Sequence, residues 1–422
     1  MRTKLWMSVV AAASLSVSAC GTETSAPTQP NVATSSMAVA PAQQPHGHVF
    51  RAFPAGTRGL HEAGVLRAAF IGDPTISYHG GPIIQAQKVA AIYWSSRTIY
   101  RGGPAPGSAS AGSSDGSLVG LFLNHLGGSP YYAINALYHD GSGHFIQNSV
   151  TYSQYWASNT GVPAPGSNVT LSAIEAKIVA GFTSGSLTFD PSTVYLVFTD
   201  SAVDQDNLFP DLDCAEHGHF TWTGHDVKFG AMPRDVDQFG CKQGDHVSGV
   251  GSPNNDPAAD AEVNTIAHET EETNTDEDIN AWLDAHGNES ADKCAWTFDP
   301  TYTTANGAKA NMNIGGKDFL IQRQWHLAFV QGCEVQVFSA TIDGPFEVQP
   351  SVLCDWTANP SGGAPPYTYA WQGNSRASSR TFGLVNGGTS FDMFVNITDA
   401  NGVTLEPDEF VDVRQTNPRC GF

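Results

Sequence analysis

The order of apolar and polar residues predicts strands and helices mixed over residues 80–337. Residues 89–94 and 194–199 are runs of mainly β-branched and aromatic side chains, which is typical of buried strands. Residues 117–126 and 171–182 space their apolar side chains three and four positions apart, which predicts two helices. We therefore expect an α+β domain over 80–337.

The pattern changes at residue 338 and predicts a separate all-β domain over 338–422. Residues 391–397 alternate apolar and polar side chains, and Asp-Ala-Asn-Gly at 399–402 is a hairpin signal. Short strands separated by turns predict a small β-sandwich. The run Ser-Gly-Gly-Ala-Pro-Pro-Tyr-Thr-Tyr-Ala-Trp at 361–371 resembles the signature of polycystic-kidney-disease-type (PKD), immunoglobulin-like domains. This resemblance implies a spacer or adhesion module.

The N-terminal residues have the features of an export signal. Two basic residues precede an apolar run at 5–17, and small residues then lead to Cys20. Val-Ser-Ala-Cys resembles a bacterial lipobox, which implies a lipoprotein signal peptide over 1–19 and lipidation of Cys20. The alternative is an ordinary signal peptide followed by a chance cysteine. The apolar run is shorter than the ~20 residues of a membrane span, and residues 20–79 are expected to form a flexible tether.

Composition narrows the function classes. The chain has 41 Asp+Glu against 20 Lys+Arg, a formal net charge of −21, which argues against a nucleic-acid partner. It has no P-loop, no Gly-x-Gly-x-x-Gly in a strand–helix context and no Gly-x-Ser-x-Gly, so nucleotide binding and serine-hydrolase chemistry lack support. Together with the export signal, this predicts an extracytoplasmic protein that is secreted or lipid-anchored to the cell envelope, at the outer membrane or cell surface.

The cysteines predict disulfides. An even number beyond Cys20 in an exported chain is typical of a disulfide framework, and six cysteines allow fifteen pairings. Thiolate metal ligation is the alternative, but the sequence has no Cys-x-x-Cys spacing. We favour pairing in chain order, because each bond then closes a loop within one subregion: Cys214 with Cys241, Cys294 with Cys333, and Cys354 with Cys420.

The most informative chemistry lies on a predicted helix that starts at Asp256 and Pro257, a good N-cap and first helical residue. His268 and Glu272 are four residues apart on this helix, so both side chains lie on one face, with Glu269 close by. The apolar positions predict one buried stripe along the helix, formed by Ala259, Val263, Ile266 and Thr270.

This spacing matches the His-Glu-x-x-His zinc helix, with Glu272 in the place of the second ligand. Downstream, Asn288-Glu289-x-x-Asp292 resembles the element that supplies the third zinc ligand in thermolysin-like gluzincins, and we expect it on a second helix. The resemblance implies that His268, Glu272 and Glu289 bind the metal, that Asp292 orients His268, and that Glu269 is the general base. A carboxylate in the second position makes the donor set more anionic, so manganese or calcium is an alternative to zinc. A hydrogen-bonded carboxylate cluster without metal is the other interpretation.

Further polar residues have two interpretations each. On a strand, His217 and His219 would share a face and reach a metal, or they line a disulfide-pinned loop. Asn274-x-Asp276-x-Asp278 starts like a calcium loop but lacks glycine at the sixth position, which favours a solvated acidic turn. His326 is a candidate donor to a developing oxyanion, or a partly buried histidine.

Several short blocks follow one another along the chain. They are 92–94, 129–132, 194–198, 214–218, the stretch from His268 to Cys294, Trp325 and Cys333. In this order they resemble those of the EXORDIUM (phosphate-induced protein 1) family. Plant members of that family are secreted or wall-associated proteins linked to growth control, without a settled enzymatic activity, whereas bacterial relatives resemble metallopeptidases. The resemblance implies an extracytoplasmic role for residues 80–333.

Together these observations predict a lipid-anchored surface protein with a zincin-like domain followed by the immunoglobulin-like sandwich. The leading hypothesis for its function is a metal-dependent hydrolase of the peptidase type. A non-catalytic EXORDIUM-like surface protein is the second, and an adhesin or glycan-binding protein is the third. The expected partners are a membrane, through the anchor, and a peptide or cell-surface polymer.

Overall fold

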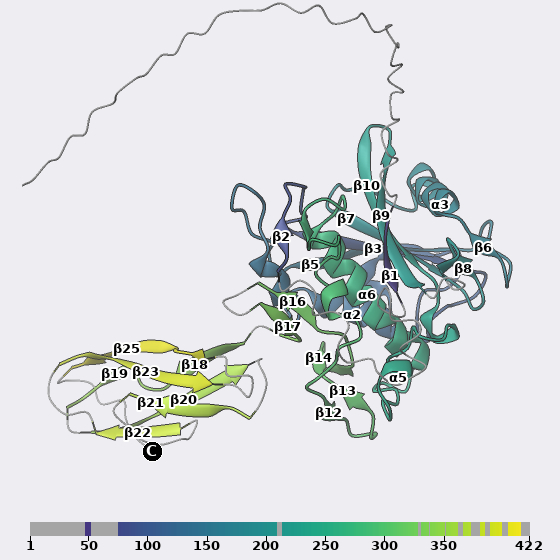
Figure 1. Ribbon diagram of the computed structural model, residues 1–422. Coiled ribbons are helices and arrows are strands. Elements are labelled where there is room, and N and C mark those ends of the chain that lie inside the picture. The colour runs from purple at the N-terminus through teal and green to yellow at the C-terminus, as the bar shows by residue number, and fades with distance from the viewer. Residues whose placement is uncertain are drawn as a thin grey trace, which may run out of the picture. The chain divides into compact units, whose positions relative to one another are not determined.

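The computed structural model contains a mixed α/β domain and a mostly β C-terminal region (Figure 1). The expected signal peptide, Cys20 and the hairpin turn at 399–402 lie outside the described residues. The structure describes residues 47–51, 75–208, 213–327, 331–336, 338–350, 352–361, 366–372, 380–384, 389–398 and 404–414.

A central mixed sheet organises the α/β domain. In spatial order its strands are β1 (Gly47–Arg51), β9 (Asp213–Trp222), β10 (His225–Met232), β7 (Thr193–Thr199), β3 (Gln87–Trp94), β5 (Val150–Ser158) and β4 (Ala109–Ala111). The four middle strands, β10, β7, β3 and β5, run parallel. β9 and β4 pair antiparallel at either side, and β1 pairs antiparallel with β9.

The apolar runs form middle strands because both faces of the sheet are covered. Alternate residues of β3 pack into two different cores. Val89, Ala91 and Tyr93 pack with helices α2 (Leu118–Leu126) and α6 (Pro257–Thr275), whereas residues 90, 92 and 94 pack with helix α3 (Leu171–Ser184). The predicted strands and the first two predicted helices are confirmed, and the domain has helices on both faces of a largely parallel sheet.

Helix α6 differs from the predicted amphipathic helix. It begins at Pro257 as expected, but every residue from Ala259 to Thr275 is buried, not only one stripe. Segments from elsewhere in the chain cover the side that was expected to face solvent. The amide of Gln322, for example, donates to Asn264 Oδ1, and the side chain of Asn135 donates to the carbonyl of Glu271. The helix therefore carries its carboxylates through the interior.

The expected tether over residues 20–79 contains two strands of this domain. β1 pairs with β9 through backbone hydrogen bonds, and β2 (Ser77–Tyr78) pairs with β11 (Trp282–Leu283). β1 covers the edge of β9, which would otherwise expose unpaired backbone groups. The α/β domain thus includes residues that precede residue 80.

Short elements complete the α/β domain. They include the small hairpins β14–β15 and β16–β17 and the 3₁₀ turn η4, which lies close to the candidate site. Their bounds are η1 Gly112–Ser114, η2 Tyr132–Leu137, β6 Asn168–Val169, β8 Asp204–Gln205, η3 Asp235–Asp237, α5 Gln243–His246, η4 Asp292–Cys294, β12 Tyr302–Thr303, β13 Lys309–Ala310, β14 Met312–Ile314, β15 Lys317–Phe319, β16 Gln324–His326 and β17 Gly332–Glu334.

The C-terminal region consists of two sheets around one core. One sheet has the order β18-β20-β22 and the other β19-β25-β23-β21, with β24 paired to β23. Trp356 and Trp371 lie in the common core with Val395 and Val411. The bounds are β18 Ser339–Asp343, β19 Glu347–Val348, β20 Leu353–Ser361, β21 Thr368–Trp371, β22 Arg380–Leu384, β23 Phe391–Thr398, β24 Thr404–Leu405 and β25 Asp408–Val413.

Two of the three predicted disulfides are present. Cys214 is bonded to Cys241, and Cys294 to Cys333. The third predicted pair cannot be placed, because Cys420 lies outside the described residues. Disulfides persist in oxidising compartments, so these bonds indicate an extracytoplasmic location. Among the helices that the structure describes, none has the length and apolar character needed to cross a membrane.

Candidate metal centre

A cluster of imidazoles and carboxylates lies between α6 and β9. Helix α6 supplies His268, Glu269 and Glu272, and β9 supplies His217. All four side chains are 0% exposed. Two more carboxylates come from Glu289 and from Asp292, the first residue of η4. The Asp292 side chain is 14% exposed, and the Glu289 side chain is fully buried.

His268 forms the first group of the cluster. Its Nε2 lies 3.0 Å from Glu272 Oε2 and 3.7 Å from Asp292 Oδ1. The helix brings His268 and Glu272 to one face, whereas Asp292 arrives from a segment that is distant in sequence. One ring nitrogen therefore faces two carboxylate oxygens, and the three ligand atoms all lie within 4.8 Å of one another.

His217 forms the second group. Its Nδ1 lies 3.0 Å from Glu269 Oε2 and 3.7 Å from Glu272 Oε2, again with the three ligand atoms within 4.8 Å of one another. Glu272 belongs to both groups and contributes the same oxygen to each. The opposite nitrogen of His217, Nε2, lies 3.5 Å from Glu289 Oε2.

Backbone amides fix two of these carboxylates. The amide of Asp292 donates to Glu272 Oε1 over 2.9 Å, which leaves Oε2 on the side of the two imidazoles. The amide of Glu289 donates to Asp292 Oδ2 over 3.2 Å, and Asp292 Oδ1 faces His268. Each carboxylate thus has one oxygen held by the turn and the other directed at an imidazole, as in preorganised ligand sets.

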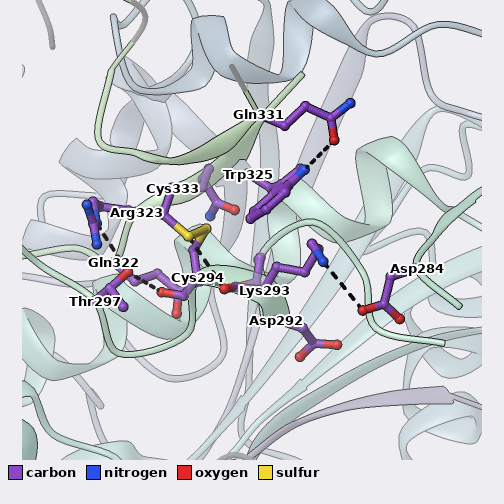
Figure 2. Close-up of a disulfide and its surroundings, with 12 residues drawn as sticks. Asp284, Asp292, Lys293, Cys294, Thr297, Gln322, Arg323, Trp325, Gln331 and Cys333 are labelled. Atoms are coloured by element: carbon purple, nitrogen blue, oxygen red, sulfur yellow. Dashed lines mark hydrogen bonds and ion pairs between the residues drawn. A yellow bond between two sulfur atoms is a disulfide. The ribbon is translucent and has the colours of Figure 1, made fainter. Parts of the chain in front are cut away.

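Figure 2 shows how η4 is held in place. The disulfide from Cys294 to Cys333 joins it to β17, and the ammonium of Lys293 lies 4.3 Å from the ring centroid of Trp325. Lys293 Nζ also lies 3.5 Å from Asp284 Oδ2. Because Asp292 immediately precedes these contacts, they restrict where its carboxylate lies.

The donor set fits a divalent cation. Two ligand atoms that are each about 2.1 Å from one ion lie about 3.0–3.4 Å apart for octahedral or tetrahedral angles. The nitrogen-to-oxygen distances of 3.0 and 3.7 Å in each group are within a few tenths of an ångström of that range. Imidazole with carboxylate suits several divalent metals, and the geometry supports none of them over the others.

The structure groups these side chains differently from the ligand set expected from the sequence. Glu289 faces His217 and not the His268–Glu272 pair, whereas Asp292, expected to orient His268, faces the same nitrogen as Glu272. The expected second helix is also absent, since Glu289 precedes a 3₁₀ turn of three residues. Backbone contacts of that turn, which the residue spacing does not reveal, decide which carboxylate reaches which imidazole.

His217 was the principal omission from the predicted ligands. It lies 52 residues before Glu269, so no local spacing links the two. The only signal was its alternation with His219, and the expectation that both histidines share a face of the strand agrees with their contacts to Glu269 and Asp278, which belong to α6 and the segment after it. His326 lies on β16, where burial lowers its pKa, and it belongs to neither group.

The acidic segment after α6 is not a solvated turn. Asp276 is buried, and its Oδ1 accepts the backbone amides of Asn280 and Ala281, at 2.5 and 2.6 Å. Asp278 lies 3.6 Å from the ring of His219, which also pairs with Asp226. That third group is partly exposed, and Lys228 supplies a cation 3.0 Å from Asp226.

Other buried acids of the domain lie outside the centre. Burial, and then the charge of Glu272, raise the pKa of Glu271 well above its usual value. Near the start of α6, burial raises the pKa of Glu262 to about 8, and burial together with the charge of Glu262 raises that of Asp235. Cys214 and Cys241 lie near Asp235 but are bonded to each other, so they are not thiolate ligands.

A cleft of about 630 Å³ opens at the other end of α6. Its lining includes Arg101, Ser117, Asp256 and Lys317 but none of the six residues of the cluster. At 1.5 Å per residue, Asp256 and His268 are about 18 Å apart along the helix. The cleft therefore does not reach the candidate metal centre.

No protein-family model matches this chain, and a search of characterised proteins also finds no match.

Proposed function

We propose that the α/β domain is a metal-dependent hydrolase of the peptidase type, with its metal held by His268, Glu272 and Asp292. The observation that carries this proposal is the approach of two carboxylate oxygens to one nitrogen of His268, at 3.0 and 3.7 Å. Zinc is the metal favoured by the likeness of this helix to the zinc-binding one, with manganese or calcium as alternatives.

The residues of the chain have distinct tasks in this proposal. A bound dication would supply Lewis acidity, polarising a substrate carbonyl. Glu269, next to the first ligand on α6, would accept a proton from the attacking water. His217, whose ring lies 3.0 Å from Glu269 Oε2, would help to keep that carboxylate in position. Exclusion of bulk water around these buried groups strengthens each electrostatic interaction.

The EXORDIUM-like blocks support the extracytoplasmic setting of this proposal. The family resemblance spans the segments that supply the cluster, including 214–218 and the stretch from His268 to Cys294. The lipobox-like sequence supports anchoring of the mature chain through a lipid on Cys20. The PKD-like sequence of the C-terminal region supports a spacer or adhesion role for that region.

Burial of the α6 ligands favours a second candidate function, a non-catalytic surface protein in which the metal joins α6 to the segment that supplies Asp292. The ligand side chains of α6 are 0% exposed, and the cleft at the far end of the helix does not reach them. A structural metal needs no opening to substrate, whereas a catalytic one does. The two candidates make the same prediction for metal content and opposite predictions for turnover.

The test uses the full chain purified without a metal-affinity tag. Elemental analysis should find bound divalent metal, and the protein should cleave members of a broad peptide library. Glu269→Gln should abolish cleavage while metal stays bound at His268. Glu262→Gln, a buried glutamate on the same helix but outside the cluster, is the matched control and should retain cleavage. Metal without cleavage in the unaltered protein would select the structural role, and protein without metal would exclude both.

Anchoring has its own test. Cys20→Ala should move the protein from the membrane fraction to the soluble extracytoplasmic fraction of cells that express it. An unchanged membrane fraction would contradict the lipid anchor and leave the metal centre unaffected.

A further inference from the structure

We propose that this cluster binds two divalent cations that share the carboxylate of Glu272, an inference that rests on the metal binding in the proposed function. His268, Glu272 and Asp292 form one position. His217, Glu269 and the same Glu272 form the other. The number of ions, their spacing and the residues that bind the second one are new features of the centre.

The first argument for two ions is the position of the Glu272 carboxylate. Its Oε2 lies 3.0 Å from His268 Nε2 and 3.7 Å from His217 Nδ1, so one oxygen is placed between imidazoles from α6 and β9. Its Oε1 is held by the amide of Asp292. An oxygen between two nitrogen donors can bridge two ions, and bridged pairs in hydrolytic enzymes are about 3.5–4 Å apart.

The second argument for two ions is the formal charge of the cluster. The carboxylates of Glu269, Glu272, Glu289 and Asp292 surround two imidazoles in the interior of the domain. Together they have a formal charge of −4, so one dication leaves −2 and two dications leave none. Uncompensated charge is very unfavourable in a buried site. The second ion therefore neutralises what the first leaves.

The third argument for two ions is the pair of carboxylates on either side of the His217 ring. Its Nδ1 faces the shared carboxylate, and its Nε2 lies 3.5 Å from Glu289 Oε2. A metal-binding histidine commonly presents one nitrogen to the ion and donates its other N–H to a carboxylate, which fixes the tautomer. In the proposed arrangement His217 Nε2 would donate to Glu289, whose Oε2 lies 3.5 Å away, and Glu269 would bind the second ion through Oε2 and accept the proton through Oε1.

The alternative is a single ion at His268, with His217 and Glu269 joined only by a hydrogen bond of 3.0 Å. The two arrangements differ in stoichiometry and in magnetic coupling. Manganese is the probe, because imidazole and carboxylate both bind it and two Mn²⁺ ions about 4 Å apart give a spin-coupled electron paramagnetic resonance spectrum.

The experiment loads the metal-free full chain with MnCl₂ and removes unbound metal. We expect two manganese ions per chain by elemental analysis and a spin-coupled spectrum. One ion per chain with an uncoupled spectrum would overturn the two-ion inference and leave the proposed function standing. No bound manganese, with zinc and calcium equally unbound, would overturn both.

Variants locate the second ion. His217→Gln should lower the stoichiometry from two to one and remove the coupling. His219→Gln is the matched control, since it alters the next residue on the same face of β9, and should keep two ions. Retention of two coupled ions by folded His217→Gln would overturn the placement. Should that variant fail to fold, the stoichiometry and spectrum of the unaltered protein still decide between one ion and two.

Discussion

The two halves of α6 both bury carboxylates but surround them with different groups. In the first half, Glu262 accepts the backbone amide of Asp235, and the hydroxyl of Thr265 donates to the Asp235 carboxylate. In the second half, Glu269 and Glu272 face the imidazoles of His217 and His268. Helix α6 thus pairs Glu262 with Asp235 of η3 and, two turns later, contributes three side chains to the cluster of imidazoles and carboxylates.

The difference shows two ways of accommodating a buried acid. The first-half pair takes up protons, because burial raises the pKa of Glu262 to about 8 and raises that of Asp235. In the second half, imidazoles from another strand make cation binding the alternative to protonation. The sequence of the helix is acidic in both halves, so the neighbouring strand and turn decide which solution applies.

Removal of metal should produce the largest effect and act only on the second half. We predict that a strong chelator lowers the free energy of unfolding by about 5–10 kcal/mol, because apparent binding energies of buried sites are folding energies. Calorimetric melting with and without chelator measures this loss. Glu262→Gln, which alters only the first half, should lose the same amount of stability on chelation. Identical melting of treated and untreated protein would show that metal does not stabilise the second half of α6.

The first half should respond to pH. A folded-state pKa near 8 lies above the ordinary value of 4.5, so the folded chain keeps a proton that the unfolded chain releases. Stability should therefore fall as pH rises from about 4.5 to 8, by up to about 5 kcal/mol at about 1.4 kcal/mol per pKa unit. Chemical denaturation at several pH values, with metal saturating throughout, measures the slope.

Glu262→Gln should make that slope smaller, because glutamine does not titrate, and the slope that remains comes from Asp235 and Glu271, whose pKa values burial also raises. Glu175→Gln, at a position on α3 outside both halves, is a control that should keep it. A Glu262→Gln slope equal to that of the unaltered protein would show that Glu262 takes up no proton over this pH range, and the contrast between the halves would then be lost.

One disulfide lies near the acid pair and the other near the candidate metal centre. Removing each disulfide in turn therefore tests the two regions separately. Cys214 and Cys241 lie near Asp235, whereas Cys294 lies two residues after Asp292. The sequence separations of 27 and 39 residues predict a similar loss of about 4 kcal/mol when either bond is removed. Only the pair Cys294→Ser and Cys333→Ser should also weaken metal affinity, by about 10–100-fold.

Titration calorimetry on both double variants measures the metal affinity of each and so tests this difference. Equal losses of affinity in the two would mean that the disulfides stabilise the fold without positioning Asp292 in particular.

Much of the fold follows from local sequence. Buried strands and two helices were predictable because apolar spacing reflects the layers that the chain must cover. The start of α6 was predictable from Asp256 and Pro257. Its complete burial was not, because the covering contacts, such as that between Gln322 and Asn264, come from segments that are far away in sequence.

The candidate site was predictable where its residues share a helix and not beyond. Four-residue spacing placed His268 and Glu272 on one face, and the 3.0 Å distance between them agrees. His217 has no spacing relation to α6, since strand pairing alone sets its position. The relative places of Glu289 and Asp292 depend on backbone hydrogen bonds in a 3₁₀ turn, for which residue identities give no rule.

The smallest predicted effect concerns the third group, on the same face of β9 as His217. His219 lies 2.8 Å from Asp226 and 3.6 Å from Asp278, and Lys228 already supplies a positive charge 3.0 Å from Asp226. His219→Gln should therefore cost only about 1 kcal/mol of stability, as expected for partly exposed ion pairs, and leave metal content unchanged. Denaturant unfolding and elemental analysis measure the two quantities. Loss of a metal ion in this variant would show that the third group binds a cation. The ammonium of Lys228 would then not be the positive charge that neutralises these carboxylates.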